Sequence, residues 1–155
     1  MESLTFRSSV RRWRRDARGA EILEFAVVLP LLLFVLAGII DMGLLFNNYE
    51  TLTNAAREGA RMAAVPGWIE DDVKARVKLY LEADGMDTTA VVTTVTPVAI
   101  NVPGGVVSGV KVGVSYPYKY LILGPIAQLV QTKATFNEVT LTASTTMRSE
   151  IAAGL

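Results

Sequence analysis

A single glutamate near the start of a long apolar run is the residue of this sequence most suited to carry chemistry. Glu24 stands directly before a stretch, Phe25 to Ile40, that contains no charged residue. A charge inside a bilayer costs about 2.5–3.5 kcal/mol at mid-membrane, so an acid in such a run is a candidate functional residue. Because Glu24 lies near one end of the run, where the cost is lower, an acid at the headgroup boundary remains an open alternative.

Other residue types point away from catalysis. The 155 residues include no cysteine and no histidine, which removes disulfides, thiolate ligands, and the commonest metal ligand and general base. The segment GVVSG at 105–109 imitates a nucleophile elbow but has no histidine to serve its serine. The acidic triplet at 70–72 is interpreted as a helix N-terminus rather than a metal site. We therefore expect a non-enzyme with no cofactor, no metal and no small-molecule substrate.

The charges are unevenly distributed, although the formal net charge is zero. Residues 1–19 hold six arginines against two acidic residues, a local charge of +4 beside the apolar run. Since positive flanks stay on the cytoplasmic side, the N-terminus is expected there and the C-terminal part outside. Nucleic-acid binding is disfavoured, because the arginine cluster adjoins the apolar run and has no interleaved aromatic residue beyond Trp13.

The apolar run is long enough to anchor the protein in a membrane. Residues 22–46 would form about 37 Å of helix, more than the ~30 Å hydrocarbon core. A removable signal sequence, including one of the twin-arginine type, would have a shorter apolar part. Asp41, the second acid of the run, is expected at the outer boundary, reaching water. The helix should continue outside the membrane to Val65, where Pro66-Gly67 ends it.

Small residues recur at helical spacing in the part of this helix beyond the membrane. A glycine in the middle of an exposed helix costs about 1 kcal/mol, so its presence suggests that close packing requires it. Small residues four positions apart let helix backbones approach each other. We expect this face to pack against the protein's own domain or a neighbouring subunit through Ala55, Ala56, Gly59, Ala60 and Ala63.

A second, amphipathic helix is predicted over residues 68–84. Its acidic first turn and following basic residues suit the helix dipole, and Glu70–Lys74 and Asp72–Arg76 are possible ion pairs. One apolar stripe is expected to face the core, formed by Ile69, Val73, Val77, Tyr80 and Leu81.

The remaining chain is rich in β-branched residues and turns. Strands are predicted over 91–100, 110–116 and 139–147, with an apolar connection over 121–130 that Gly124-Pro125 interrupts. The predicted fold class is α+β: a long N-terminal membrane helix that continues outside, a second amphipathic helix, and a small antiparallel sheet of about three strands.

Two segments of the sequence carry a family resemblance. RGAEILEFAVVLPLLLFVLAGIIDMGLLF (18–46) and LTNAAREGARMAA (52–64) resemble the TadE-like family, whose members are minor pseudopilins of Flp-type, tight-adherence pilus systems. The end of a strand at 116–118 and the threonine-rich final strand are similar to the C-terminal half of that family. TadF- and TadG-like relatives share the N-terminal pattern, and a TadF-like protein is hard to separate from it.

The resemblance implies a processed membrane protein with a pilin-like fold. A leader of residues 1–19 would be removed by a prepilin peptidase at the Gly19–Ala20 bond, leaving a helix over 20–65 and an extracytoplasmic domain over 66–155. Glu24 would become the fifth mature residue, followed by Phe25, in the motif that sets subunit register.

The implied function is assembly or initiation of the pilus from the inner membrane, and the pilus or its base is an alternative location for the protein. The implied partners are the prepilin peptidase, other pilins or pseudopilins, the tight-adherence platform and the lipid bilayer. A different possibility is a permanently anchored single-pass protein whose outer domain binds a partner. The state of the N-terminus separates these two hypotheses.

Overall fold

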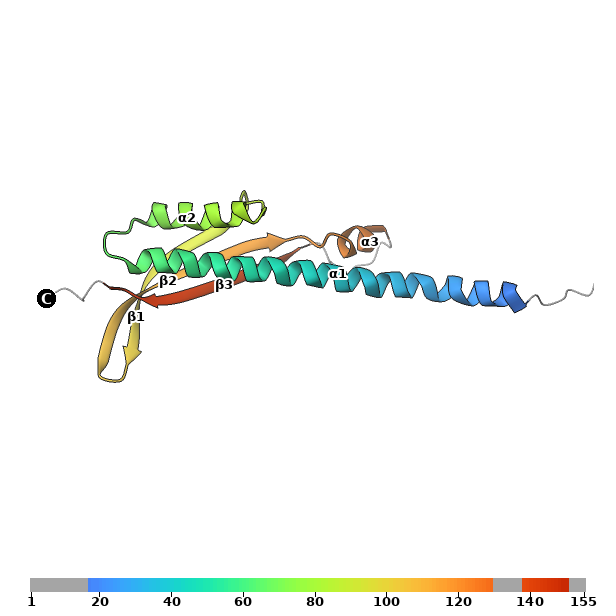
Figure 1. The fold of residues 1–155 in the computed structure, drawn as a ribbon, viewed down its shortest axis with the longest axis horizontal. Coiled ribbons are helices and arrows are strands. Elements are labelled where there is room, and N and C mark those ends of the chain that lie inside the picture. The colour runs from blue at the N-terminus through green and yellow to red at the C-terminus, as the bar shows by residue number, and fades with distance from the viewer. Residues whose placement is uncertain (1–16, 130–137, 151–155) are drawn as a thin grey trace, which may run out of the picture. The chain divides into compact units, whose positions relative to one another are not determined.

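The structure, a computed structural model, describes residues 17–129 and 138–150. The chain divides after Leu36 into two compact units, of which the second contains the sheet. The fold is α+β, as predicted, with a long apolar helix, a second helix and a three-stranded antiparallel sheet (Figure 1). The elements in chain order are α1 (Ala17–Ala64), α2 (Glu70–Ala83), β1 (Val92–Val102), β2 (Gly105–Tyr118), α3 (Leu123–Leu129) and β3 (Val139–Arg148).

The sheet has the order β1-β2-β3, with both neighbouring pairs antiparallel. β1 and β2 form a hairpin that pairs Val102 with Gly105. Gly104 in the connecting turn has φ +106°, a backbone conformation that favours glycine. Pro97 lies in β1, an edge strand, where a missing backbone N–H is tolerated.

The core of the second unit lies where α1, α2 and the sheet meet. Alternate residues of β2 point into it, as the sequence pattern predicts. The α2 stripe is only partly as predicted, because Ile69 and Tyr80 at its edges are exposed. Buried core side chains include Leu52, Val73, Val77, Leu81, Val110, Val112, Val114, Tyr118, Leu141 and Ala143.

The expected apolar connection after β2 contains a short helix, α3. Gly124-Pro125, which interrupts the apolar pattern in the sequence, lies within this helix. Pro125 occupies the first turn of α3, where a backbone N–H has no helical acceptor and proline is tolerated.

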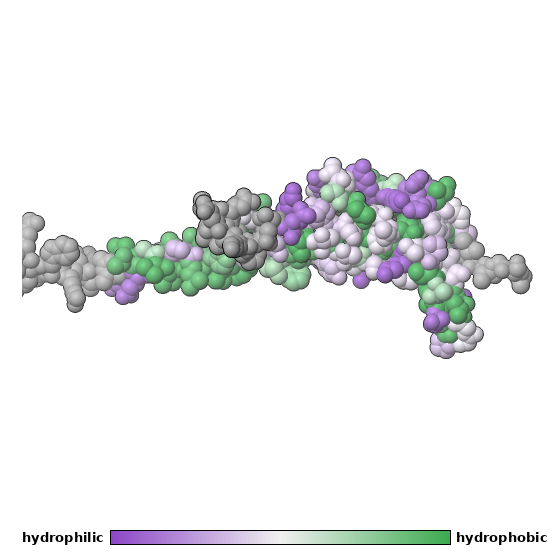
Figure 2. Space-filling view, turned by 180° about the vertical axis from the view of Figure 1, so that it is seen from behind, coloured by the Kyte–Doolittle hydropathy of each residue, from purple (hydrophilic) through white to green (hydrophobic). Residues whose placement is uncertain are grey.

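The N-terminal part of α1 exposes apolar side chains around its circumference. Figure 2 shows these residues gathered along the helix. By length and composition, Glu21–Ala64 is the one helix among the described residues that could cross a membrane. A helix that is apolar all round suits a lipid environment rather than water. The exposed apolar residues of the second half of the predicted span include Ile39, Ile40, Met42, Leu44 and Phe46.

Candidate functional site

The residues predicted to form the processing site lie at the start of α1. The helix begins at Ala17, three residues before the predicted start, so Gly19 and Ala20 have helical backbone. Glu24 and Phe25 follow on the same helix and are exposed. Among the described residues, nothing makes a hydrogen bond or ion pair with the Glu24 carboxylate. Most of the expected leader, residues 1–16, lies outside the described residues.

The small-residue face of α1 lies against the protein's own α+β unit. A Cβ atom added to Gly59 would stand 2.6 Å from Val77 Cγ2 and 3.2 Å from Val112 Cγ1, so α2 and β2 both approach the helix backbone there. A separation of 2.6 Å is too short for two carbon atoms, and glycine permits this approach. The fully buried small residues around it are Ala55, Ala56, Ala60 and Ala63.

Asp41 is fully buried, with 0% of its surface exposed, and the expectation that it reaches water is wrong. Its carboxylate accepts hydrogen bonds from three consecutive backbone N–H groups just before and at the start of α3. Leu121 N–H donates to Oδ1 at 3.1 Å, and Leu123 N–H donates to Oδ2 at 2.7 Å. Ile122 N–H lies 3.1 Å from both oxygens. A buried carboxylate has no hydrogen bonds to water, and these backbone bonds take their place.

Tyr118 adds a second connection to the same position. Its hydroxyl donates to the backbone carbonyl of Asp41 at 3.2 Å, and its ring meets that of Tyr120 edge to face at a centroid distance of 5.6 Å. Burial, and then the nearby Asp41 carboxylate, raise the pKa of Tyr118. The end of β2 and the start of α3 are thus both attached to α1 at Asp41.

A cluster of charged residues joins α1 to α2 beyond the predicted membrane span. Glu58 accepts hydrogen bonds from Arg61 on its own helix at 3.1 Å and from Arg76 on α2 at 2.8 Å. The bonds from Arg61 and then Arg76 lower the pKa of Glu58. The predicted Asp72–Arg76 pair is wrong, because Arg76 pairs with Glu58 instead. The predicted Glu70–Lys74 pair is confirmed, at 2.7 Å.

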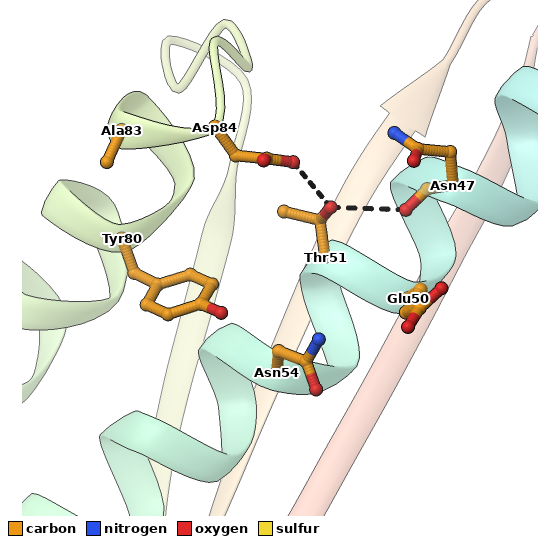
Figure 3. Close-up of a pocket in the computed structure, with 7 residues that line it drawn as sticks. All are labelled: Asn47, Glu50, Thr51, Asn54, Tyr80, Ala83 and Asp84. Carbon is orange, nitrogen blue, oxygen red and sulfur yellow. Dashed lines mark hydrogen bonds between the residues drawn. The ribbon is translucent and has the colours of Figure 1, made fainter.

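A polar cleft of about 450 Å³ lies between α1 and α2 (Figure 3). The Thr51 hydroxyl stands 2.6 Å from Asp84 Oδ2 and 3.1 Å from the Asn47 carbonyl oxygen, so its single proton has two acceptors. Tyr80 lines the opposite wall (Figure 3). The acidic residues of the cleft are bonded or directed to solvent, and over residues 17–129 and 138–150 no three possible ligands gather as a metal site.

Sequence reasoning missed the role of Asp41, although the argument that singled out Glu24 applies to it equally. Both are acids within one apolar run, and a buried acid needs partners. Those partners are backbone groups 80 to 82 positions away, which side-chain identities do not reveal.

The described residues define a class of protein, a small α+β unit carried on a helix that is apolar enough to cross a membrane once. Within that class, the chain was also compared with models of protein families. The model described as TadE-like protein matches residues 19–61, which confirms the resemblance drawn from the sequence. The match covers Gly19, Glu24 and most of the small-residue face. Comparisons with curated proteins and with solved structures find no significant match.

Proposed function

We propose that this protein is a TadE-like minor pseudopilin that assembles or initiates a Flp-type, tight-adherence pilus. The observation that carries the proposal is the family match, which begins at Gly19 and includes Glu24. In this proposal residues 1–19 are a leader, 20–65 the pilin helix, and 66–155 an extracytoplasmic domain. A prepilin peptidase cuts between Gly19 and Ala20 on the cytoplasmic face, as the arginine-rich flank favours.

The proposed chemistry is the pairing of two charges at the membrane edge. Cleavage creates an α-amine at Ala20, and Glu24 of a neighbouring subunit offers a carboxylate at similar depth. Attraction between opposite charges is stronger in a medium of low dielectric constant, and each charge is costly to bury without the other. The exposed carboxylate of Glu24, without a bonding partner among the described residues, leaves it available for such a contact.

Such a pair fixes the axial position of each helix when subunits leave the bilayer and join a fibre. The partners are therefore other pilins or pseudopilins and the assembly platform of the inner membrane. The polar contacts and cleft of the domain need no catalytic role in this account, and we propose that the protein is not an enzyme.

The proposal is tested by replacing Glu24 alone. Glu24→Gln retains shape and hydrogen-bonding groups but removes the charge, so insertion and cleavage should persist while pilus assembly falls. The matched control is Glu21→Gln, at an exposed acid one helical turn away, which should assemble normally.

The measurement is surface pilus yield, with crosslinked pseudopilin complexes as a second readout, at wild-type protein levels. Normal assembly by Glu24→Gln would remove the charge-pair mechanism. It would then leave Glu24 as part of the peptidase recognition site, or as a headgroup-level acid of an anchored protein.

A further inference from the structure

The hydrogen bonds of Asp41 fix the position of residues 121–123 along α1. Leu121, Ile122 and Leu123 all donate backbone N–H groups to that one side chain, and Tyr118 donates to its carbonyl. Because these contacts are all within the second unit, the start of α3 is held beside α1 at the level of Asp41.

In a bilayer, that level is expected near the outer end of the hydrocarbon core. A core of ~30 Å takes about 20 helical residues, and a span counted from Ile22 therefore ends near Asp41. Exposed apolar side chains flank Asp41 on both sides, with Ile39 at 64% and Phe46 at 62%, as suits contact with lipid around the last turns of the span. A segment that Asp41 holds against the helix is therefore expected at the depth of the bilayer surface.

The held segment has the composition of a membrane-interface anchor. The exposed Lys119 and the partly exposed Tyr120 lead into it, and tyrosine is enriched at membrane–water boundaries, where a lysine can reach the headgroups. Leu121 then exposes 65% of its surface, and Pro125 is exposed too, while Ile122 and Ile126 are partly so.

Backbone chemistry decides whether such a segment can enter the interface. Irregular chain is tolerated at membrane depth only where its polar groups are satisfied within the protein. Asp41 satisfies the three N–H groups at 121–123, and its own charge is fully buried rather than facing lipid.

We infer that residues 121–126 form a second membrane contact, with their apolar side chains set in the lipid interface beside the outer end of the α1 span. Asp41 determines the depth of this contact. The inference depends on the membrane span alone and is independent of any role in a pilus.

The absence of cysteine makes the test direct, because one introduced cysteine can carry one fluorescent label. Full-length protein with Leu121→Cys, labelled with an environment-sensitive dye, is placed in phosphatidylcholine–phosphatidylglycerol vesicles at high lipid-to-protein ratio. The vesicles contain lipids brominated on the acyl chains, which quench dyes in the hydrocarbon or interface. Ile40→Cys is the positive control, and Val106→Cys, 63% exposed in the β1–β2 hairpin, is the aqueous control.

The expected result is a loss of emission at position 121 close to that at position 40, with iodide in the buffer quenching position 106 much more strongly. Pro125→Cys provides a second label should Leu121→Cys fail to fold. The inference is overturned if positions 121 and 125 respond like position 106. It is also overturned if they are shielded from iodide but unaffected by brominated lipid, which would indicate that protein and not lipid covers them.

Discussion

A buried carboxylate on an apolar helix is stable only if its oxygens are hydrogen-bonded, and Asp41 meets this condition through backbone groups about 80 positions away. Glu24, on the same helix, is exposed. The two acids of the apolar run therefore differ in kind. Asp41 organises the protein's own fold, whereas Glu24 is the one that we assign to contact between subunits.

At position 59, the size of the side chain should determine the stability of the folded protein. Gly59→Leu places a side chain where even a Cβ would collide with Val77, so the variant should lose about 1–3 kcal/mol of unfolding free energy. Arg57→Leu adds the same side chain at an exposed position two residues away and should change little. Thermal unfolding of the detergent-solubilised protein, followed by circular dichroism, compares the two. Equal midpoints would contradict the close approach of α1, α2 and β2.

Glu58 should make stability depend on pH in the acidic range. Its pKa in the folded protein is below the ordinary value of 4.5, so the unfolded chain binds a proton first. The stabilisation is therefore fully present above about pH 4.5 and is lost as the pH falls through the folded pKa.

Glu58→Gln should thus be less stable than wild type at neutral pH, by at most about 1 kcal/mol for this partly exposed pair. The difference should shrink in strongly acidic buffer. Denaturant unfolding at several pH values measures it, with Glu50→Gln on the exposed side of the same helix as the control. A difference that is constant with pH would mean that the arginine bonds do not form in solution.

At the scale of elements, the second unit has a core of its own. The clustered buried residues all lie at or beyond Leu52, so none belongs to the predicted membrane part of α1. The α1 segment beyond Asn48, α2 and the sheet supply the buried side chains of that cluster, and from the predicted membrane part Leu45 packs against it, partly buried.

A fragment of residues 48–155 should therefore fold as a monomer. Circular dichroism should show helix and sheet with cooperative thermal unfolding. Because the fragment lacks Asp41, the amides of residues 121–123 should exchange hydrogen faster than in a fragment beginning at Ala37, measured by mass spectrometry in detergent. A random-coil spectrum would show that the domain needs its anchor or a partner.

The sequence predicts the elements better than their contacts. The α1 helix, the α2 helix and the three strands follow from hydrophobic period and turn residues, which are local signals. The Asp41 site depends on backbone groups contributed by a distant segment, and Arg76 chooses Glu58 over the nearer Asp72. Local spacing says which pairs are possible, but tertiary packing decides which of them form. The helix α3 was missed because proline in a first turn resembles proline in a loop.

At the scale of the whole molecule, the two parts of α1 have different environments. Its N-terminal part exposes apolar side chains and its C-terminal part is buried in the domain through small residues. Large apolar side chains stay exposed as far as Tyr49, and the small-residue face is buried from Ala55 onward. A helix of this kind can serve a permanent anchor or a subunit that later leaves the membrane, and the difference lies in whether the leader is removed.

The most direct test of the proposed function is N-terminal sequencing of the protein extracted from membranes of cells with an active prepilin peptidase. The account predicts a mature chain beginning with Ala20, and a Gly19→Arg variant that keeps its leader and runs as a larger protein. A wild-type chain that still begins at Met1 or Glu2 in those cells would contradict the proposal and favour a permanently anchored protein.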